Sequence, residues 1–103
     1  VGTNSMATAA MLRAGADQAA TGENSVVVAS SRAEAILGPI GIVIADSMMG
    51  EITPRMAVSI GQSHAKRILI PVNHCDNIIV GVAESSMTRN VQNAMTALEA
   101  LIS

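Results

Sequence analysis

The 103-residue sequence predicts a single α/β domain in which helices cover a mostly parallel sheet. Its organising stretch, residues 35–45, is almost wholly apolar and too short to cross a bilayer, so it must be buried in protein. We interpret Ala35–Leu37 as a central strand that stops at Gly38-Pro39, because proline lacks the N–H that a central ladder needs. Apolar runs at 68–72 and 78–82 supply further strands, and their closeness leaves open an antiparallel strand at one edge.

The composition limits the classes of function. The chain has no aromatic residue and a net charge of −2, so it offers neither stacking platforms for bases nor an electrostatic attraction for nucleic acid. One Cys cannot form an intramolecular disulfide, which fits a reducing compartment. We therefore expect a cytoplasmic protein that binds neither nucleic acid nor membrane, with a core of Ile, Val, Leu, Ala and 7 Met.

A helix is predicted near the start of the chain. Asn4 or Ser5 can cap it by accepting an N–H from the first turn. Apolar residues at helical spacing carry the helix through Met6–Ala14, and Gly15 is expected to end it in the left-handed conformation. A short, weak strand is expected over Ala16–Ala20.

The next segment is ambiguous between helix and strand. Thr21–Asn24 is a loop, and Asn24 or Ser25 could cap a helix over Ser25–Arg32. The β-branched run Val26–Val28 favours a strand, whereas the position between two predicted parallel strands favours a crossover helix. We prefer the helix.

The middle of the chain holds a second buried segment and a clear helix. Ile42–Met49 is expected to be either a short helix or a continuation of the strand, and Gly50 closes it. Thr53-Pro54 predicts a helix start, with Thr as the N-cap and Pro at the first helical position. The helix is expected to reach Gln62, and three of its residues should face inward: Met56, Ala57 and Ile60.

The last third alternates strands with a polar turn and ends in a helix. Ile68–Val72 predicts a buried strand, Asn73–Asn77 a polar turn and Ile78–Val82 another strand. The final helix carries one continuous apolar stripe, formed by Val91, Ala94, Met95, Leu98, Leu101 and Ile102.

Four polar or glycine-containing turns follow predicted strands, and in a parallel sheet such turns gather at the carboxyl edge. They supply backbone N–H groups, amides and one carboxylate, which suit a phosphate, a ribose or a small polar metabolite. The alternative is that they are only turns and helix caps, which need the same residue types. The candidate ligand-binding residues are Gly2, Thr3, Asn4, Thr21, Gly22, Glu23, Asn24, Gly38, Pro39, Ile40, Gly41 and Asn73.

Acidic residues and the single Cys are further candidates for a site. Glu23 could accept ribose hydroxyls or act as a base, or it could simply favour a helix start. Asp46 and Glu51 could form a carboxylate pair, but a solvated turn is the better interpretation. His74-Cys75-Asp76 is more typical of a polar turn than of a catalytic pair or metal site, so we predict no metal, and no catalytic residue is assigned.

Several blocks of residues together resemble a known family of short bacterial proteins. The blocks are Gly2-Thr3-Asn4, Ala7–Leu12, Ala14–Asp17, Thr21–Asn24, Gly38–Val43, Gly50–Pro54 and Ile68–Asn73. The family is domain of unknown function 3842, which has no established activity. The resemblance implies a small Rossmann-like protein with a further strand, glycine-rich loop and helix before the position of Val1, so that the present chain would be an N-terminally truncated fragment.

We therefore expect a Rossmann-like three-layer sandwich that binds a nucleotide or phosphorylated metabolite at the carboxyl edge of its sheet. The cofactor, if there is one, would be a nucleotide or dinucleotide, and an enzymatic role would be nucleotide-dependent oxidoreduction. The alternative is a non-catalytic assembly or regulatory module that acts as a homo-oligomer through Met-rich apolar surface.

Overall fold

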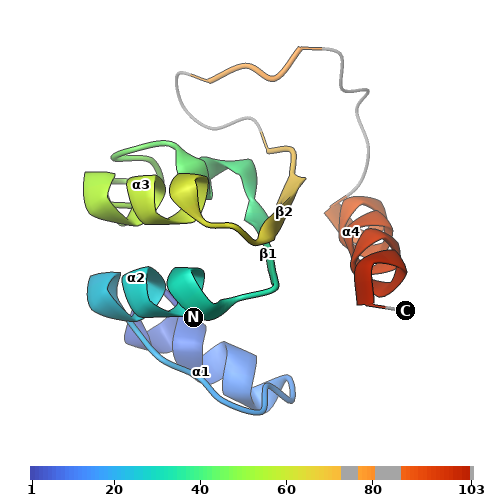
Figure 1. Ribbon diagram of the computed structural model, residues 1–103, viewed down its shortest axis with the longest axis horizontal. Coiled ribbons are helices and arrows are strands. Elements are labelled where there is room, and N and C mark those ends of the chain that lie inside the picture. The colour runs from blue at the N-terminus through green and yellow to red at the C-terminus, as the bar shows by residue number, and fades with distance from the viewer. Residues whose placement is uncertain (73–76, 81–86, 103) are drawn as a thin grey trace.

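The computed structural model describes residues 1–72, 77–80 and 87–102, which form an α/β arrangement of helices around a parallel pair of strands (Figure 1). Its elements in chain order are α1 (Ser5–Arg13), α2 (Glu23–Arg32), β1 (Ala35–Pro39), the 3-10 helix η1 (Ile40–Val43), α3 (Pro54–Gln62), β2 (Lys66–Ile70) and α4 (Met87–Ile102). No helix among these residues is both long enough and apolar enough to cross a membrane.

The sheet consists of β1 and β2, which pair in parallel from Ala35 with Lys66 to Pro39 with Ile70. β2 begins two residues earlier than predicted, because Lys66 and Arg67 pair with Ala35 and Ile36. It ends two residues earlier, at Ile70, because Pro71 has no N–H with which to extend the ladder. An isolated parallel bridge joins Gly2 to Thr21 elsewhere in the described chain.

Two predicted strands are wrong where the structure describes them. No strand forms over Ala16–Ala20, whose residues are mostly exposed and therefore lack the burial that stabilises a strand. Residues 78–80 form no strand either, and Ile78 and Val80 are 81% and 90% exposed. The predicted polar turn at 73–76 and the remainder of the last predicted strand lie outside the described residues.

Both helices of the first third form where the sequence predicts them. The Asn4 side chain caps α1 by accepting an N–H from Ala7 at 2.9 Å. After α1, Gly15 has a φ of 107°, and the N–H groups of Gly15 and Ala16 donate to carbonyls of the last helical turn, as in a Schellman motif. The ambiguous segment is helical, but Gly22 occupies the N-cap of α2 in place of the predicted Asn24 or Ser25.

Helix α3 and the residue before its cap form the core. Thr53 caps the helix by accepting the N–H of Met56 at 3.2 Å, as its sequence predicts. The predicted inward residues Met56, Ala57 and Ile60 are all buried. Ile52, only 2% exposed, packs with Met56 and Ala57, and three partly buried residues surround them: Val26, Ile42 and Met48.

The second buried segment becomes η1 followed by a tight loop. The loop is closed by hydrogen bonds from Asp46 N–H to the Ile52 carbonyl, 2.7 Å, and from Ile52 N–H to the Ser47 carbonyl, 3.3 Å. Three non-glycine residues in it have positive φ, namely Asp46, Met48 and Met49, and Gly50 follows with a φ of 84°. This left-handed run turns the chain back toward the core within a few residues.

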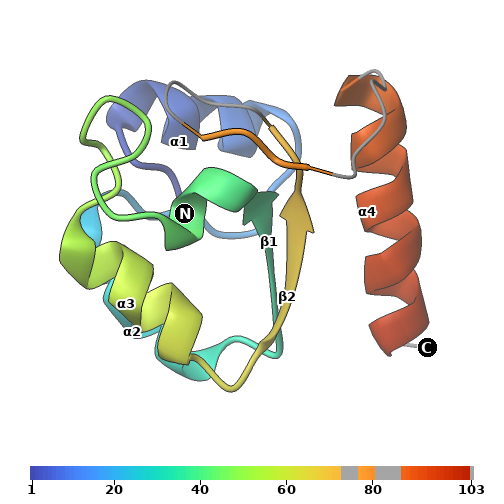
Figure 2. The ribbon, with the colours of Figure 1, turned by 90° about the horizontal axis from the view of Figure 1, so that it is seen from above.

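Helix α4 forms as predicted but buries only part of its apolar stripe. Ala94 is buried and Leu98 is partly buried, whereas Val91, Met95, Leu101 and Ile102 are exposed. Figure 2 shows α2 and α3 on one side of the strands and α4 on the other, where it packs against β2.

Replacing Ile52 by Ala is expected to lower the free energy of unfolding by about 3 kcal/mol, because it removes three methyl-sized groups from the centre of the core. Urea denaturation measures this change. The matched control Ile78→Ala should alter stability by less than about 0.5 kcal/mol, since that side chain is exposed. Equal effects of the two substitutions would contradict this description of the core.

Candidate functional site

The amino-terminal ends of α1, α2 and α3 are tied together by two glutamates. Glu51, which precedes α3, accepts a hydrogen bond from the Thr3 hydroxyl at 2.9 Å and from the Asn4 amide at 3.0 Å. Asn4 is itself the N-cap of α1, so one carboxylate connects the approach to α3 with the start of α1.

The second glutamate links α2 to α3. The Thr53 hydroxyl donates to a Glu23 carboxylate oxygen at 2.5 Å, and the other Glu23 oxygen lies 3.8 Å from the Arg55 guanidinium. Since Glu23 opens α2 and Thr53 caps α3, this contact joins two helix starts. We call Thr3, Asn4, Glu23, Glu51 and Thr53 the N-terminal cluster.

Backbone pairing holds the first residues of the chain against the start of α2. Gly2 donates its N–H to the Ala20 carbonyl, and its own carbonyl accepts the N–H of Gly22, both at 3.0 Å. The hydroxyls of Thr8 and Thr21 share a hydrogen bond of 2.7 Å beside this pairing. A Cβ on residue 2 would lie 2.4 Å from the Thr8 hydroxyl, so only glycine allows α1 to approach this closely.

The N-terminal cluster places two hydrogen-bond acceptors, the carboxylates of Glu23 and Glu51, next to the starts of helices. One of its two carboxylates, Glu23, lies beside the cation Arg55, and the side chains of Glu23, Glu51 and Arg55 all reach solvent. Carboxylates placed there favour hydroxyl donors, such as the diol of a ribose. Helix starts add partial positive charge and unpaired N–H groups.

An apolar groove of about 390 Å³ lies next to the N-terminal cluster. β1 forms one wall, Val1–Thr3 contribute to its lining, and the remaining residues come from α1, from α2 and the residue after it, from η1 and from Met48. Gly38 and Pro39 line it together with Gly2 and Thr3. Two of the predicted turns therefore lie on the same groove.

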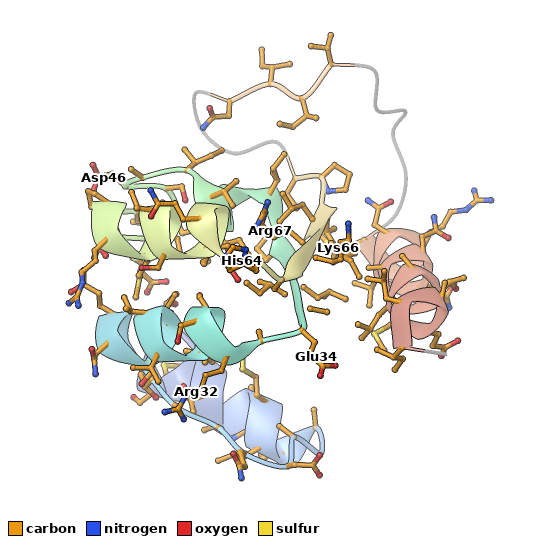
Figure 3. The ribbon with its side chains drawn as sticks, viewed as in Figure 1. Arg32, Glu34, Asp46, His64, Lys66 and Arg67 are labelled. Atoms are coloured by element: carbon orange, nitrogen blue, oxygen red, sulfur yellow. The ribbon has the colours of Figure 1, made fainter. Side chains whose placement is uncertain are left out.

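A second group of charged residues lies at the other end of the strands, where β1 and β2 begin. Figure 3 shows Arg32 at the end of α2, Glu34 just before β1, and His64, Lys66 and Arg67 around the start of β2. The Arg67 guanidinium donates to the Ser63 carbonyl at 2.7 Å and so satisfies the end of α3. Within the described ranges, no three His, Cys, Asp or Glu side chains form a group able to hold a metal ion.

Comparison with known proteins identifies the family. The family model described as a domain of unknown function, DUF3842, matches residues 1–103. The chain belongs to the DUF3842 family. No curated protein and no solved structure matches it.

In this DUF3842 protein, half of the candidate residues meet in one place. Gly2 pairs with the backbone at Thr21 and Gly22. Thr3 and Asn4 bind Glu51, and Glu23 binds Thr53, two residues further along the chain from Glu51. The six candidates among these residues are the first predicted turn and the first three residues of the second.

The other candidates have different surroundings. Gly38 and Pro39 line the groove, whereas Ile40 begins η1 and is absent from the groove lining. Gly41 is buried, and its carbonyl accepts the Ser47 hydroxyl. Asn24 is exposed on α2. Asn73 lies outside the described residues, as do His74, Cys75 and Asp76.

Glu51 has other contacts than those predicted from the sequence. The sequence offered it only as a partner of Asp46 or as part of a solvated turn. In the structure Glu51 binds Thr3 and Asn4, and Figure 3 shows Asp46 at the outer side of the loop. The available signal was its position two residues before the Thr53-Pro54 helix start, where a carboxylate meets helix N-termini.

Replacing Asn4 by Asp tests the contact between the cluster and α1. Aspartate can still cap the helix, but it loses the amide donor and places a second carboxylate beside Glu51, so stability at pH 7 should fall by about 1 kcal/mol. Thermal unfolding of the single variant and of the double variant Asn4→Asp, Glu51→Gln measures this. Glu51→Gln should recover most of the loss, because its amide can donate to the new carboxylate. A loss that the second substitution leaves unchanged would contradict the contact.

Proposed function

We propose that this chain binds a nucleotide or a related phosphorylated, hydroxyl-bearing metabolite at the N-terminal cluster. The observation that carries the proposal is that Glu51 binds Thr3 and Asn4 while Glu23 binds Thr53, which places two carboxylates among the starts of α1, α2 and α3. Ligand hydroxyls would donate to the carboxylates, in the way that acidic residues bind ribose in dinucleotide-binding folds.

The start of α2 is the best place in the cluster for a phosphate. The side chains of Asn4 and Thr53 cap α1 and α3, but Gly22 provides no side-chain cap for α2. A Cβ on Gly22 would meet no atom within 4 Å, so the backbone there is open to an approaching ligand. A helix start of this kind favours anions through its N–H groups and its dipole.

The carboxylates also limit which ligands fit. A phosphate placed directly on Glu51 or Glu23 would meet like charge, so the phosphate belongs near Gly22 and the hydroxyls near the glutamates. Arg55 offers a positive charge on the same side, 3.8 Å from Glu23. The proposal therefore favours ligands with both groups over inorganic phosphate alone.

A second candidate function is self-association through α4. The motivating observation is the exposure of Val91, Met95, Leu101 and Ile102 along the helix face that carries the apolar stripe. An apolar stripe of this kind is typical of helix-to-helix contacts. Light scattering over a dilution series distinguishes this function, because a stable oligomer that binds none of the metabolites would favour it.

Thermal-shift measurements with AMP, NAD⁺, ribose 5-phosphate and inorganic phosphate test the ligand proposal. A ligand that binds only the folded state stabilises the protein by about 2.7 kcal/mol when the free ligand concentration is one hundred times its Kd. We expect a shift with at least one ribose-containing ligand and a smaller one with inorganic phosphate. Glu51→Gln should weaken the binding about tenfold, since it removes a charged acceptor.

Glu34→Gln is the matched control for this experiment. It removes the same charge from an exposed residue at the opposite end of β1, and it should leave the ligand-induced shift unchanged (Figure 3). Equal weakening by both substitutions would show that net charge, and not the cluster, governs binding. No shift with any ribose-containing ligand would overturn the proposal.

A further inference from the structure

The side chain of Met49, in the loop before α3, is almost completely exposed. Its exposed fraction is 98%, whereas the neighbouring Met48 packs against the core cluster that contains Ile52. Burial of apolar surface stabilises a fold, so packing accounts for a methionine at position 48. The same reason does not apply to position 49, where the folded chain gains no burial from the side chain.

The backbone at Met49 is also unusual for a methionine. The N–H of Glu51 donates to the Met48 carbonyl at 3.2 Å, which closes a four-residue turn with Met49 and Gly50 at its centre. The two central residues have φ of 58° and 84°, as in a type I′ turn. Gly, Asn and Asp dominate these positions because they tolerate the left-handed conformation, so a methionine there is strained. Strained residues of this kind are concentrated at ligand-binding sites.

Met49 lies next to the N-terminal cluster along the chain. Two peptide units separate it from Glu51, so the Cα atoms of the two residues are at most about 7.6 Å apart. Glu51 is held at the cluster by its bonds to Thr3 and Asn4. In a nucleotide, the carbon that carries the base is bonded to the carbon that carries the 2′-hydroxyl. A ribose hydroxyl bound to Glu51 therefore brings the base within reach of a side chain at position 49.

The chemistry of the methionine side chain matches an aromatic base. The sequence has no Phe, Tyr or Trp on which a base could stack. The polarizable thioether of methionine makes favourable contacts with aromatic rings, and its flexible side chain adapts to their shape. A phosphorylated sugar without a base has no ring of this kind and would leave Met49 in solvent.

We propose that Met49 contacts the base of the bound ligand, which makes the ligand a nucleotide and not a sugar phosphate. This inference rests on the proposed function, because the N-terminal cluster holds the ribose and the phosphate. Met49 then acts as a specificity-determining residue, and the turn holds it in place before the ligand binds.

Isothermal titration calorimetry with AMP and ribose 5-phosphate tests the inference, because both ligands carry a phosphate and a diol but only AMP has a base. AMP should bind at least about fivefold more tightly than ribose 5-phosphate, and Met49→Ala should remove this advantage without changing the affinity for ribose 5-phosphate. The matched control Met87→Ala should change neither affinity, since it shortens an exposed methionine on α4, on the other side of the strands (Figure 2).

The outcomes separate this inference from the proposed function. The absence of binding by AMP, ribose 5-phosphate and NAD⁺ would overturn both. Equal affinities for AMP and ribose 5-phosphate, an AMP affinity that Met49→Ala leaves unchanged, or an equal loss for both ligands would overturn the inference alone.

Met49→Asn gives a second readout, which includes the protein without ligand. Asparagine tolerates the left-handed conformation, so this substitution should raise the melting temperature of the free protein by about 2–4 °C. The same variant should lose AMP affinity as Met49→Ala does. A lower melting temperature would show that the Met49 side chain stabilises the fold, and it would overturn the inference.

Discussion

The arrangement of the helices depends on three consecutive residues, Glu51-Ile52-Thr53. Glu51 holds the start of α1 through Thr3 and Asn4, Ile52 is the most buried large side chain of the core, and Thr53 caps α3 while binding Glu23 of α2. The preceding loop fixes their position through the hydrogen bonds between Asp46 or Ser47 and Ile52. Left-handed conformations at Asp46, Met48 and Met49 cost about 1 kcal/mol each, which the packing of Ile52 and the bonds of its neighbours offset.

This constraint explains why the first two predicted turns meet. Glu51 approaches the Gly2-Thr3-Asn4 turn from one side, and Thr53 approaches Glu23 in the following turn. The close approach of Gly2 to Thr8 then brings the backbone of the first residues onto Gly22. Some of the residues proposed to bind ligand are therefore also the residues that hold the helices together.

Local sequence signals predicted much of the fold because they act over a few residues. Asn4, Gly15 and the Thr53-Pro54 pair each satisfy backbone groups at a helix end, and all three behave as expected. Two strand predictions were wrong: β2 does not continue through Pro71, and no strand forms over the exposed segment Ala16–Ala20. Strand limits depend on pairing partners that lie far away in the sequence. Met-containing loops carry no comparable signal, so the left-handed turn that brings Glu51 to Thr3 and Asn4 could not be predicted.

The proposed binding site lies where α1, α2 and α3 begin. A ¹H–¹⁵N NMR titration with AMP tests this claim most directly, because it reports on every backbone amide at once. Binding at the N-terminal cluster should produce concentration-dependent shifts confined to residues near 2–4, 21–24 and 51–53, with the amides of Glu34 and Lys66 unchanged. Shifts centred instead on α4, or on the amino ends of β1 and β2, would contradict it.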